Sequence, residues 1–170
     1  MNFIESDDTD DKPGLSSLLA GSTNSANIEE YYDDWAETYD ATLKDWNYQA
    51  PVEAAATLNR YLKPGSNILD VGCGTGMFSR AISGILKCCI IGIDISAASL
   101  AVAEKNGIYV DLRRHDLQIT PLPADTNAFD AAACVGVLTY IEDASNLLAD
   151  LCRVVQPGGY VLFTQRNDRW

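Results

Sequence analysis

The pattern of hydrophobic and polar residues changes near residue 27. Residues 1–26 are rich in Asp, Ser, Gly and Thr and contain few large apolar side chains. Such a segment buries too little apolar surface to offset the entropy of ordering it, so we predict a flexible acidic tail. From residue 27 onwards, apolar side chains recur every three or four residues, which predicts one helix face made of Ile28, Tyr31, Tyr32, Trp35, Tyr39 and Leu43. Asn27 and Glu30 resemble a capping box at the start of this helix.

A regular alternation of strand and helix patterns follows. Pro51 suits the first position of a second helix, and residues 27–63 together form a predicted helical lead segment. In residues 64–170 we predict strands at 67–71, 89–93, 109–115, 129–137 and 160–164 and helices at 77–85, 96–105 and 144–156. Ser96 and Asp143 supply caps for the last two helices. Strands separated by helices predict an α/β fold built on a parallel sheet.

Acidic residues are concentrated near the N-terminus. The chain of 170 residues carries 24 acidic and 12 basic side chains, a formal net charge of −12. Residues 1–50 contain twelve of the acids and only two of the bases, so the rest of the chain is nearly neutral. We interpret the acidic run as a solvated face. The charge argues against nucleic acid as a partner, because phosphates need Lys and Arg, and against an anionic membrane surface.

The five cysteines and the single histidine do not form a metal-binding pattern. No Cys-x-x-Cys is present, and His115 alone cannot complete a zinc site of ordinary spacing. The acidic N-terminus lacks the features of a signal peptide, and the most apolar stretch, residues 131–141, is far shorter than the ~20 residues of a membrane helix. We therefore expect a reduced, cytoplasmic protein without a bound metal.

A glycine-rich loop carries the strongest chemical signal. Residues 68–76, Ile-Leu-Asp-Val-Gly-Cys-Gly-Thr-Gly, lie where a predicted strand passes into a predicted helix. Glycines let the backbone turn tightly and approach a ligand, and the helix that follows points free N–H groups toward it. A purely structural turn is one interpretation. A dinucleotide fingerprint is disfavoured, because Met77 stands where its third glycine belongs.

Two carboxylates flank this loop. Asp70 opens the pattern acid-x-Gly-x-Gly-x-Gly, and a carboxylate there can orient the loop amides and attract the cationic groups of a ligand. Asp94 ends the next strand, about 20 residues after the loop, where an acid accepts hydrogen bonds from ribose hydroxyls. Asp94 can also cap the helix that begins near Ser96. Together these residues predict a nucleoside site.

The ordered set of segments resembles a class I S-adenosylmethionine-dependent methyltransferase. The matching blocks are residues 68–76, 90–94, 115–117, 129–138 and 157–163, within about residues 64–165. The resemblance implies a Rossmann-like three-layer sandwich with a mainly parallel sheet. Residues 32–40 are similar to the lead helix of the methyltransferase-like proteins of the Williams–Beuren region.

The resemblance also implies roles for individual residues. The S-adenosylmethionine-binding residues that it implies are Asp70, Gly72, Cys73, Gly74 and Gly76 at the methionine end, Asp94 at the ribose, Ile95, Asp116 and Leu117 at the adenine, and Val135 and Tyr39 near the sulfonium. Core packing is an equally good interpretation of Tyr39, and the better one of Tyr31, Tyr32 and Trp35. We expect Cys73 to fill space, and His115 to face solvent or be satisfied rather than act as a base.

The expected activity is transfer of a methyl group from S-adenosylmethionine to a small-molecule or protein acceptor. The sulfonium is already activated, so alignment of the acceptor suffices and we assign no catalytic residue. The family's sheet has seven strands, whereas this chain stops soon after the fifth, so we expect the last two strands to be absent. Two interpretations follow: the sequence is a truncated product, or another chain covers the exposed fifth strand. A second hypothesis is a non-catalytic or truncated module that binds S-adenosylmethionine.

Overall fold

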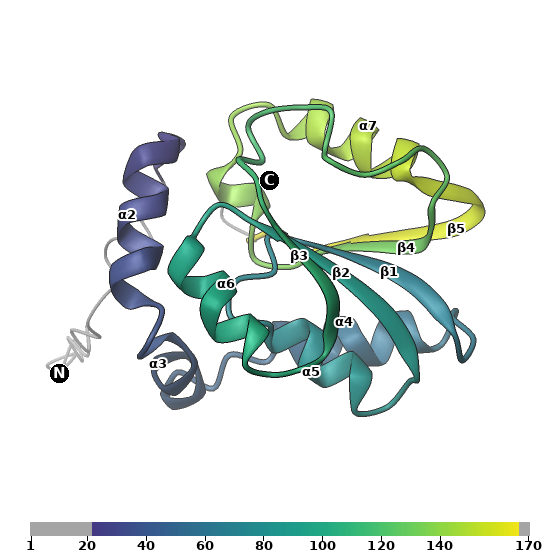
Figure 1. Ribbon diagram of the computed structural model, residues 1–170, viewed down its shortest axis with the longest axis horizontal. Coiled ribbons are helices and arrows are strands. Elements are labelled where there is room, and N and C mark those ends of the chain that lie inside the picture. The colour runs from purple at the N-terminus through teal and green to yellow at the C-terminus, as the bar shows by residue number, and fades with distance from the viewer. Residues whose placement is uncertain (1–21, 167–170) are drawn as a thin grey trace, which may run out of the picture.

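The computed structural model describes residues 22–166 (Figure 1). Most of the predicted acidic tail, residues 1–21, lies outside the described residues. The elements are, in order, α2 (Ser25–Trp35), α3 (Tyr39–Asp45), α4 (Ala50–Asn59), β1 (Ser66–Val71), α5 (Met77–Ser83), β2 (Cys88–Asp94), α6 (Ala97–Glu104), β3 (Tyr109–Arg114), β4 (Phe129–Cys134), the 3-10 helix η1 (Leu138–Tyr140), α7 (Ala144–Val154) and β5 (Val155–Phe163).

Helix α2 begins earlier than the sequence pattern predicts. Asn24 is its N-cap, and the Asn24 side chain accepts a hydrogen bond from the Asn27 N–H at 3.1 Å. The capping box predicted at Asn27 and Glu30 is therefore wrong, because both residues already lie inside the helix. The long apolar stripe is also divided by a turn into α2 and α3. The caps predicted at Ser96 and Asp143 are confirmed, since each side chain accepts the backbone N–H three residues further on.

The five strands form one parallel sheet in the order β3-β2-β1-β4-β5. Figure 1 shows α4, α5 and α6 on one side of this sheet and α7 on the other. Successive side chains of β1 point to opposite faces. Ile68 therefore packs with α4 and α5, while Leu69 and Val71 pack with α7. This arrangement confirms the predicted Rossmann-like three-layer α/β fold.

Strands β4 and β5 depart from their predicted bounds for a backbone reason. β4 ends at Cys134, earlier than predicted, and the chain turns at Gly136, where φ is 76°. β5 begins at Val155, earlier than the predicted start at residue 160, and it includes the Pro-Gly-Gly segment at residues 157–159. The pairing partner on β5 jumps from Val155 to Tyr160, so residues 156–159 bulge out of the ladder.

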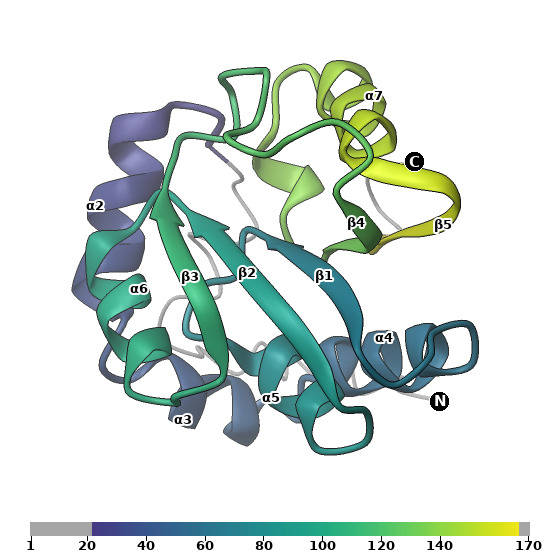
Figure 2. The same cartoon turned by 45° about the vertical axis from the view of Figure 1, so that its right-hand side comes forward.

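Later strands lie on both sides of β1 in the sheet. The chain proceeds first to β2 and β3 on one side of β1, and later to β4 and β5 on the other. The carboxyl ends of β1 and β4 therefore border the crevice where sheets of this type bind ligands. Figures 1 and 2 place α2 alongside α6, near this end of the sheet.

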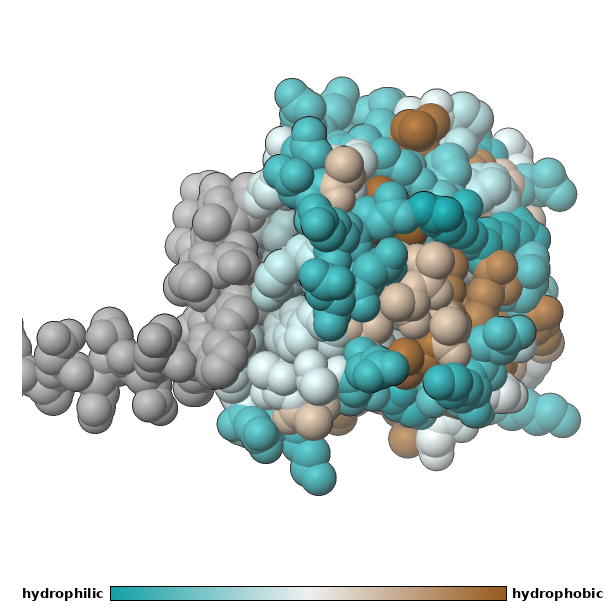
Figure 3. All heavy atoms as spheres, turned by 60° about the vertical axis from the view of Figure 1, so that its left-hand side comes forward, coloured by the Kyte–Doolittle hydropathy of each residue, from teal (hydrophilic) through white to brown (hydrophobic). Residues whose placement is uncertain are grey.

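The surface mixes polar and apolar areas. Hydrophilic residues cover much of the face drawn in Figure 3, and apolar residues gather in one area between them. Tyr61, in the turn after α4, and Tyr160 of β5 are both exposed, and their ring centroids lie 5.0 Å apart. Among residues 22–166 there is no helix long and apolar enough to cross a membrane. The cytoplasmic location stays a prediction.

Candidate functional site

A pocket of about 90 Å³ opens at the carboxyl ends of β1, β2 and β4, where the strand order indicates a crevice. The predicted site residues that line it are Tyr39, Gly72, Gly74, Asp94, Ile95, Asp116, Leu117 and Val135. Asp70 and Cys73 instead border an adjoining cavity of about 40 Å³, and Gly76 is the N-cap of α5. The fold thus brings together most of the predicted residues, although they are widely spaced in the sequence.

The glycine loop has a backbone shape that side chains disfavour. Its three glycines have φ values between 51° and 89°. A Cβ atom at Gly72 would in addition collide with the Val137 side chain. The N–H groups of Gly72 and Cys73 both donate to the Ile93 carbonyl, at 2.8 and 3.0 Å. These bonds fix the loop against the end of β2, beside the pocket.

Asp94 connects the glycine loop to the start of α6. Its Oδ2 accepts the Gly74 N–H at 2.8 Å, and its Oδ1 accepts the Ser96 N–H at 2.9 Å. Burial raises the pKa of Asp94, and these backbone hydrogen bonds oppose the rise. A carboxylate offers about four acceptor sites, so capacity remains for hydroxyl groups of a ligand in the pocket.

Asp70 has different partners from those expected. Its Oδ2 accepts hydrogen bonds from the Ser79 hydroxyl at 2.6 Å and the Tyr109 hydroxyl at 2.9 Å. Burial raises the pKa of Asp70 to about 6, against the effect of these two hydroxyls. Of the two loop carboxylates it is Asp94, rather than Asp70, that accepts a glycine-loop amide in the described structure.

The segment after β3 forms another wall of the pocket. Asp116 Oδ1 accepts the Gln118 N–H at 2.9 Å, and this turn brings Leu117 and Gln118 to the pocket. The Gln118 amide donates to the Tyr140 carbonyl at 2.8 Å and accepts the Glu142 N–H at 3.0 Å. Gln118 is not among the predicted site residues, although its position two residues after Asp116 was a usable signal.

Three tyrosine rings from three elements line the pocket: Tyr32 of α2, Tyr39 of α3 and Tyr140 of η1. The ring centroid of Tyr32 lies 5.9 Å from that of Tyr39 and 6.0 Å from that of Tyr140. Burial raises the pKa of all three, so the hydroxyls stay neutral at physiological pH. Core packing of Tyr32 was an incomplete interpretation, because the ring also faces the pocket. Tyr140 was missed; the signal was an aromatic residue shortly after a buried strand.

The acidic lead segment binds to the body of the protein. Asp33 accepts hydrogen bonds from the Ser96 hydroxyl at 2.5 Å and from a backbone N–H in the first turn of α6 at 3.1 Å. Asp40 forms an ion pair with Arg80 at 2.5 Å and accepts the Thr75 hydroxyl at 2.5 Å. The interpretation as a solvated face is wrong for these two carboxylates. Both hold α2 and α3 against the pocket.

Two reactive side chains near the pocket have structural partners. His115 Nε2 lies 2.8 Å from the Ile119 carbonyl, so the predicted satisfied histidine is observed. The Cys73 sulfur is buried, and burial with the nearby Asp70 raises the pKa of its thiol well above the ordinary value. Cys73 therefore remains protonated and fills space beside Gly92.

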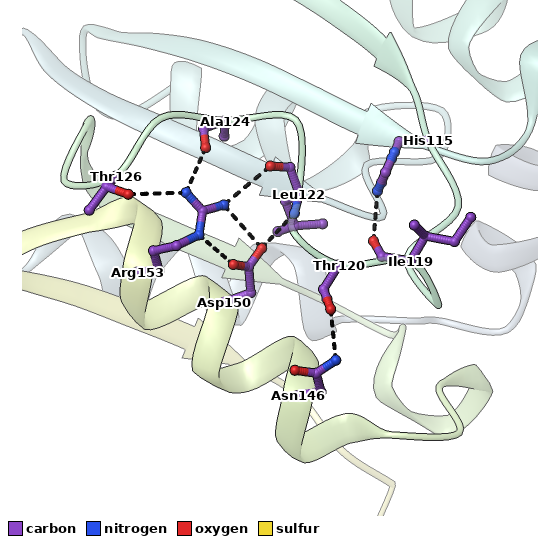
Figure 4. A network of polar contacts seen from close by, with 9 residues as sticks. All are labelled: His115, Ile119, Thr120, Leu122, Ala124, Thr126, Asn146, Asp150 and Arg153. Carbon is purple, nitrogen blue, oxygen red and sulfur yellow. Dashed lines mark hydrogen bonds and ion pairs between the residues drawn. The ribbon is translucent and has the colours of Figure 1, made fainter.

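The loop that carries Asp116 is fixed to α7 by a polar network (Figure 4). Arg153 donates to the carbonyls of Ala124 at 2.8 Å and Leu122 at 3.2 Å, and pairs with Asp150 at 2.5 Å. Asp150 accepts the Leu122 N–H at 2.6 Å. These bonds satisfy backbone groups of a segment that has no strand or helix of its own.

Known proteins share this sequence pattern and fold. The family described as "Methyltransferase domain" matches residues 69–163. Human methyltransferase-like protein 27 is 35% identical over 144 residues, which are 81% of this chain and 57% of that protein. The ubiquinone biosynthesis O-methyltransferase of Hahella chejuensis is 32% identical over 108 residues, 61% of this chain and 44% of the enzyme. The chain therefore spans about half the length of these relatives.

A solved structure resembles the fold over nearly all of the chain. DhpI in its complex with SAM and HEP aligns with a TM-score of 0.64 at 25% identity, over 92% of this chain and 70% of DhpI. The resemblance that the glycine loop and the following strands indicated is thereby confirmed at the level of the family.

Proposed function

Because the chain belongs to the methyltransferase domain family, we propose that its pocket binds S-adenosylmethionine and presents the methyl group to an acceptor. The observation that carries the proposal is the charge of the pocket wall. Asp94 and Asp116 both line it, and among the described lining residues there is neither Lys nor Arg. A sulfonium nucleoside with an ammonium group suits such a wall, whereas a pyrophosphate does not.

In this proposal, each group of site residues contacts a different part of S-adenosylmethionine. Asp94 accepts the ribose hydroxyls, and Ile95 and Leu117 contact the adenine, with Asp116 accepting its amino group. The glycine loop supplies close backbone approach to the methionine part, with Asp70 and Cys73 beneath it and Gly76 opening α5. Val135 and Tyr39 lie near the sulfonium.

The reaction needs positioning more than chemistry from the protein. When bound, S-adenosylmethionine supplies an activated methyl group with a neutral thioether as leaving group. The protein excludes water with the rings of Tyr32, Tyr39 and Tyr140 and holds the acceptor in line. Positioning of this kind contributes up to roughly 7–11 kcal/mol to lowering a barrier.

Calorimetric titration with S-adenosylmethionine and S-adenosylhomocysteine tests the site. We expect Asp94→Ala to weaken both ligands by about tenfold to a hundredfold, since hydrogen bonds to a charged group contribute about 1.5–3 kcal/mol. Glu104→Gln, an exposed acid on the adjacent helix, is the matched control and leaves both affinities unchanged. Equal affinities for wild type and Asp94→Ala would exclude the ribose assignment.

A second assay separates methyl transfer from binding alone. The chain is incubated with methyl-labelled donor and a cell extract, and label is followed into small molecules and proteins. Incorporation of label shows an enzyme. Tight binding of the nucleoside without a labelled product, over extracts of several kinds, shows the non-catalytic module.

The predicted partner chain at β5 stays a prediction. β5 pairs with β4 on one side, and within residues 22–166 no strand pairs with its other side. A free edge of this kind can hydrogen-bond a further strand.

A further inference from the structure

A second, larger cavity adjoins the pocket just described. Its volume is about 340 Å³, within the range of small-molecule sites. Tyr32, Tyr39, Gly136 and Tyr140 line both spaces, so the two cavities adjoin along these residues. A molecule in the second cavity would therefore lie next to the ligand of the first. We call the second cavity the aromatic chamber.

Aromatic rings make up much of the wall of the aromatic chamber. Besides the three shared tyrosines, the rings of Trp46 and Tyr48 line it. Aromatic rings pack most favourably against another ring, in edge-to-face or offset geometry. The chamber thus suits a planar aromatic molecule of one or two rings.

One buried polar atom in the chamber lacks a partner. The Oε1 atom of Gln165 is buried, and no hydrogen bond reaches it from the described residues. Gln165 lines the chamber. A buried acceptor without a donor is unfavourable, and a ligand with an O–H or N–H group would satisfy it. The occupant is therefore expected to carry a hydrogen-bond donor.

The charged and titratable groups of the chamber restrict the occupant further. Among the described residues that line it there is no Asp, Glu or His, and the one charged side chain is Arg166. Burial raises the pKa of Tyr39, Tyr48 and Tyr140, so none of them is a base near neutral pH. A cationic amine would meet an unfavourable charge. An acceptor oxygen has to lose its proton without a protein base.

We propose that the aromatic chamber holds the methyl acceptor, and that this acceptor is a small phenol with a second donor group on its ring. The proposal rests on the proposed function. A phenol ionises near pH 10 in water, far more easily than an aliphatic alcohol, and the Arg166 guanidinium favours the phenolate. Gln165 Oε1 accepts the hydrogen bond of the second donor.

The transfer step balances without a further reactant. The ring hydroxyl releases its proton to water. A lone pair of the ring oxygen then forms the O–CH₃ bond while the S–CH₃ bond breaks, and the electron pair of that bond passes to sulfur. The products are an aryl methyl ether and a neutral thioether.

Binding of nitroaromatic probes tests the chamber without relying on activity. The full chain, saturated with S-adenosylhomocysteine, is titrated with 4-nitrocatechol, 4-nitrophenol, nitrobenzene and 4-nitrobenzylamine. We expect 4-nitrocatechol to bind about tenfold more tightly than nitrobenzene and about fivefold more tightly than 4-nitrophenol, with 4-nitrobenzylamine weakest. Equal affinities for the catechol and the amine would overturn the proposal.

Two variants assign the roles of the polar residues. Gln165→Leu should abolish the preference for 4-nitrocatechol over 4-nitrophenol and leave nitrobenzene binding unchanged. Arg166→Gln should raise the pKa of bound 4-nitrocatechol, read from its absorbance. Arg60→Gln, which removes an exposed positive charge elsewhere, is the matched control and should not change that pKa. A preference for the catechol that persists in Gln165→Leu contradicts the assignment.

The two proposals fail in distinguishable ways. If S-adenosylhomocysteine binds and no phenol does, the acceptor class is wrong and the proposed function stands. If S-adenosylhomocysteine does not bind the wild type, the proposed function itself fails. Gln165 and Arg166 do not line the nucleoside pocket, so unchanged S-adenosylhomocysteine affinity also shows that each variant is folded.

Discussion

At the scale of single residues, the glycine loop depends on a tight fit that composition alone does not reveal. Gly72 has a positive φ of 71°, and its Cα faces the Val137 side chain so closely that no Cβ fits. Any substitution of Gly72 is therefore destabilising for two separate reasons. One is backbone strain, and the other is collision with Val137.

The two costs can be separated by mutation. We expect Gly72→Ala to lower the free energy of unfolding by about 2–4 kcal/mol and to abolish nucleoside binding. Val137→Ala removes the colliding methyl groups, so the double variant should recover the packing part of the loss and retain the strain. Denaturant unfolding of the four proteins measures the coupling. Strictly additive effects would show that the contact with Val137 is unimportant.

Asp70 gives the protein a pH dependence of defined sign. Its pKa is about 6 in the folded protein against an ordinary 3.8, so the folded state holds a proton that the unfolded state has released. Stability from this group is fully present below pH 4 and is lost as pH rises through about 6. Asp70→Asn should remove this loss. The free energy of unfolding of Asp70→Asn, measured in urea and taken relative to wild type, should rise by up to about 3 kcal/mol from pH 4 to pH 7. If the stabilities of the two proteins change with pH in parallel, the assignment is contradicted.

At the scale of elements, the lead segment is fastened to the sheet domain by carboxylates. Asp33 accepts two hydrogen bonds at the start of α6, one of them from a backbone N–H that a helix leaves unpaired. Because Tyr32 is adjacent to Asp33 and lines the pocket, the position of α2 and the shape of the pocket are linked.

Removal of the hydrogen bonds that Asp33 accepts should lower both protein stability and ligand affinity. We expect Asp33→Ala to destabilise the protein by about 1–2 kcal/mol, as for a lost helix cap, and to weaken S-adenosylhomocysteine several-fold. Asp34→Ala removes the same charge from an exposed neighbour and should change stability by less than about 0.5 kcal/mol. Hydrogen exchange in α2 should quicken only in the first variant. Equal exchange in both would show that Asp33 does not fix the helix.

The elements themselves were largely predictable, because their signals are local. Helix caps at Ser96 and Asp143 and the apolar strands around Ile68 and Ile90 depend on neighbouring residues. The break between α2 and α3 was not predictable from periodicity, since the aromatic stripe continues across it. The bulge in β5 depends on its pairing with β4, which is a contact between distant parts of the chain.

At the scale of the whole molecule, a ligand that binds only the folded chain raises its melting temperature. S-adenosylhomocysteine at a hundred times its Kd should add about 2.7 kcal/mol, or roughly 5–10 °C for a chain of this size. NAD should add nothing, because the pocket wall is acidic. Thermal unfolding under the same conditions measures both shifts. A larger increase in melting temperature with NAD than with S-adenosylhomocysteine would point to a dehydrogenase instead.

The site was predictable where it follows a strand and unpredictable where it depends on distant contacts. Asp94 was predicted from its place at a strand end, and the family resemblance implied Asp116 and Val135; all three line the pocket. Tyr140 and Gln165 reach the two cavities through turns whose direction depends on the whole fold. Sequence alone likewise did not reveal that Asp94 accepts the loop amide while Asp70 bonds the hydroxyls of Ser79 and Tyr109.

The attachment of the β3–β4 loop to α7 has a genetic consequence. Arg153 and Asp150 support the backbone of a loop whose opposite end, at Asp116, forms part of the pocket, yet neither residue lines that pocket. A random-mutagenesis screen for loss of nucleoside capture should therefore recover substitutions of Asp150 and Arg153, although α7 does not border the pocket.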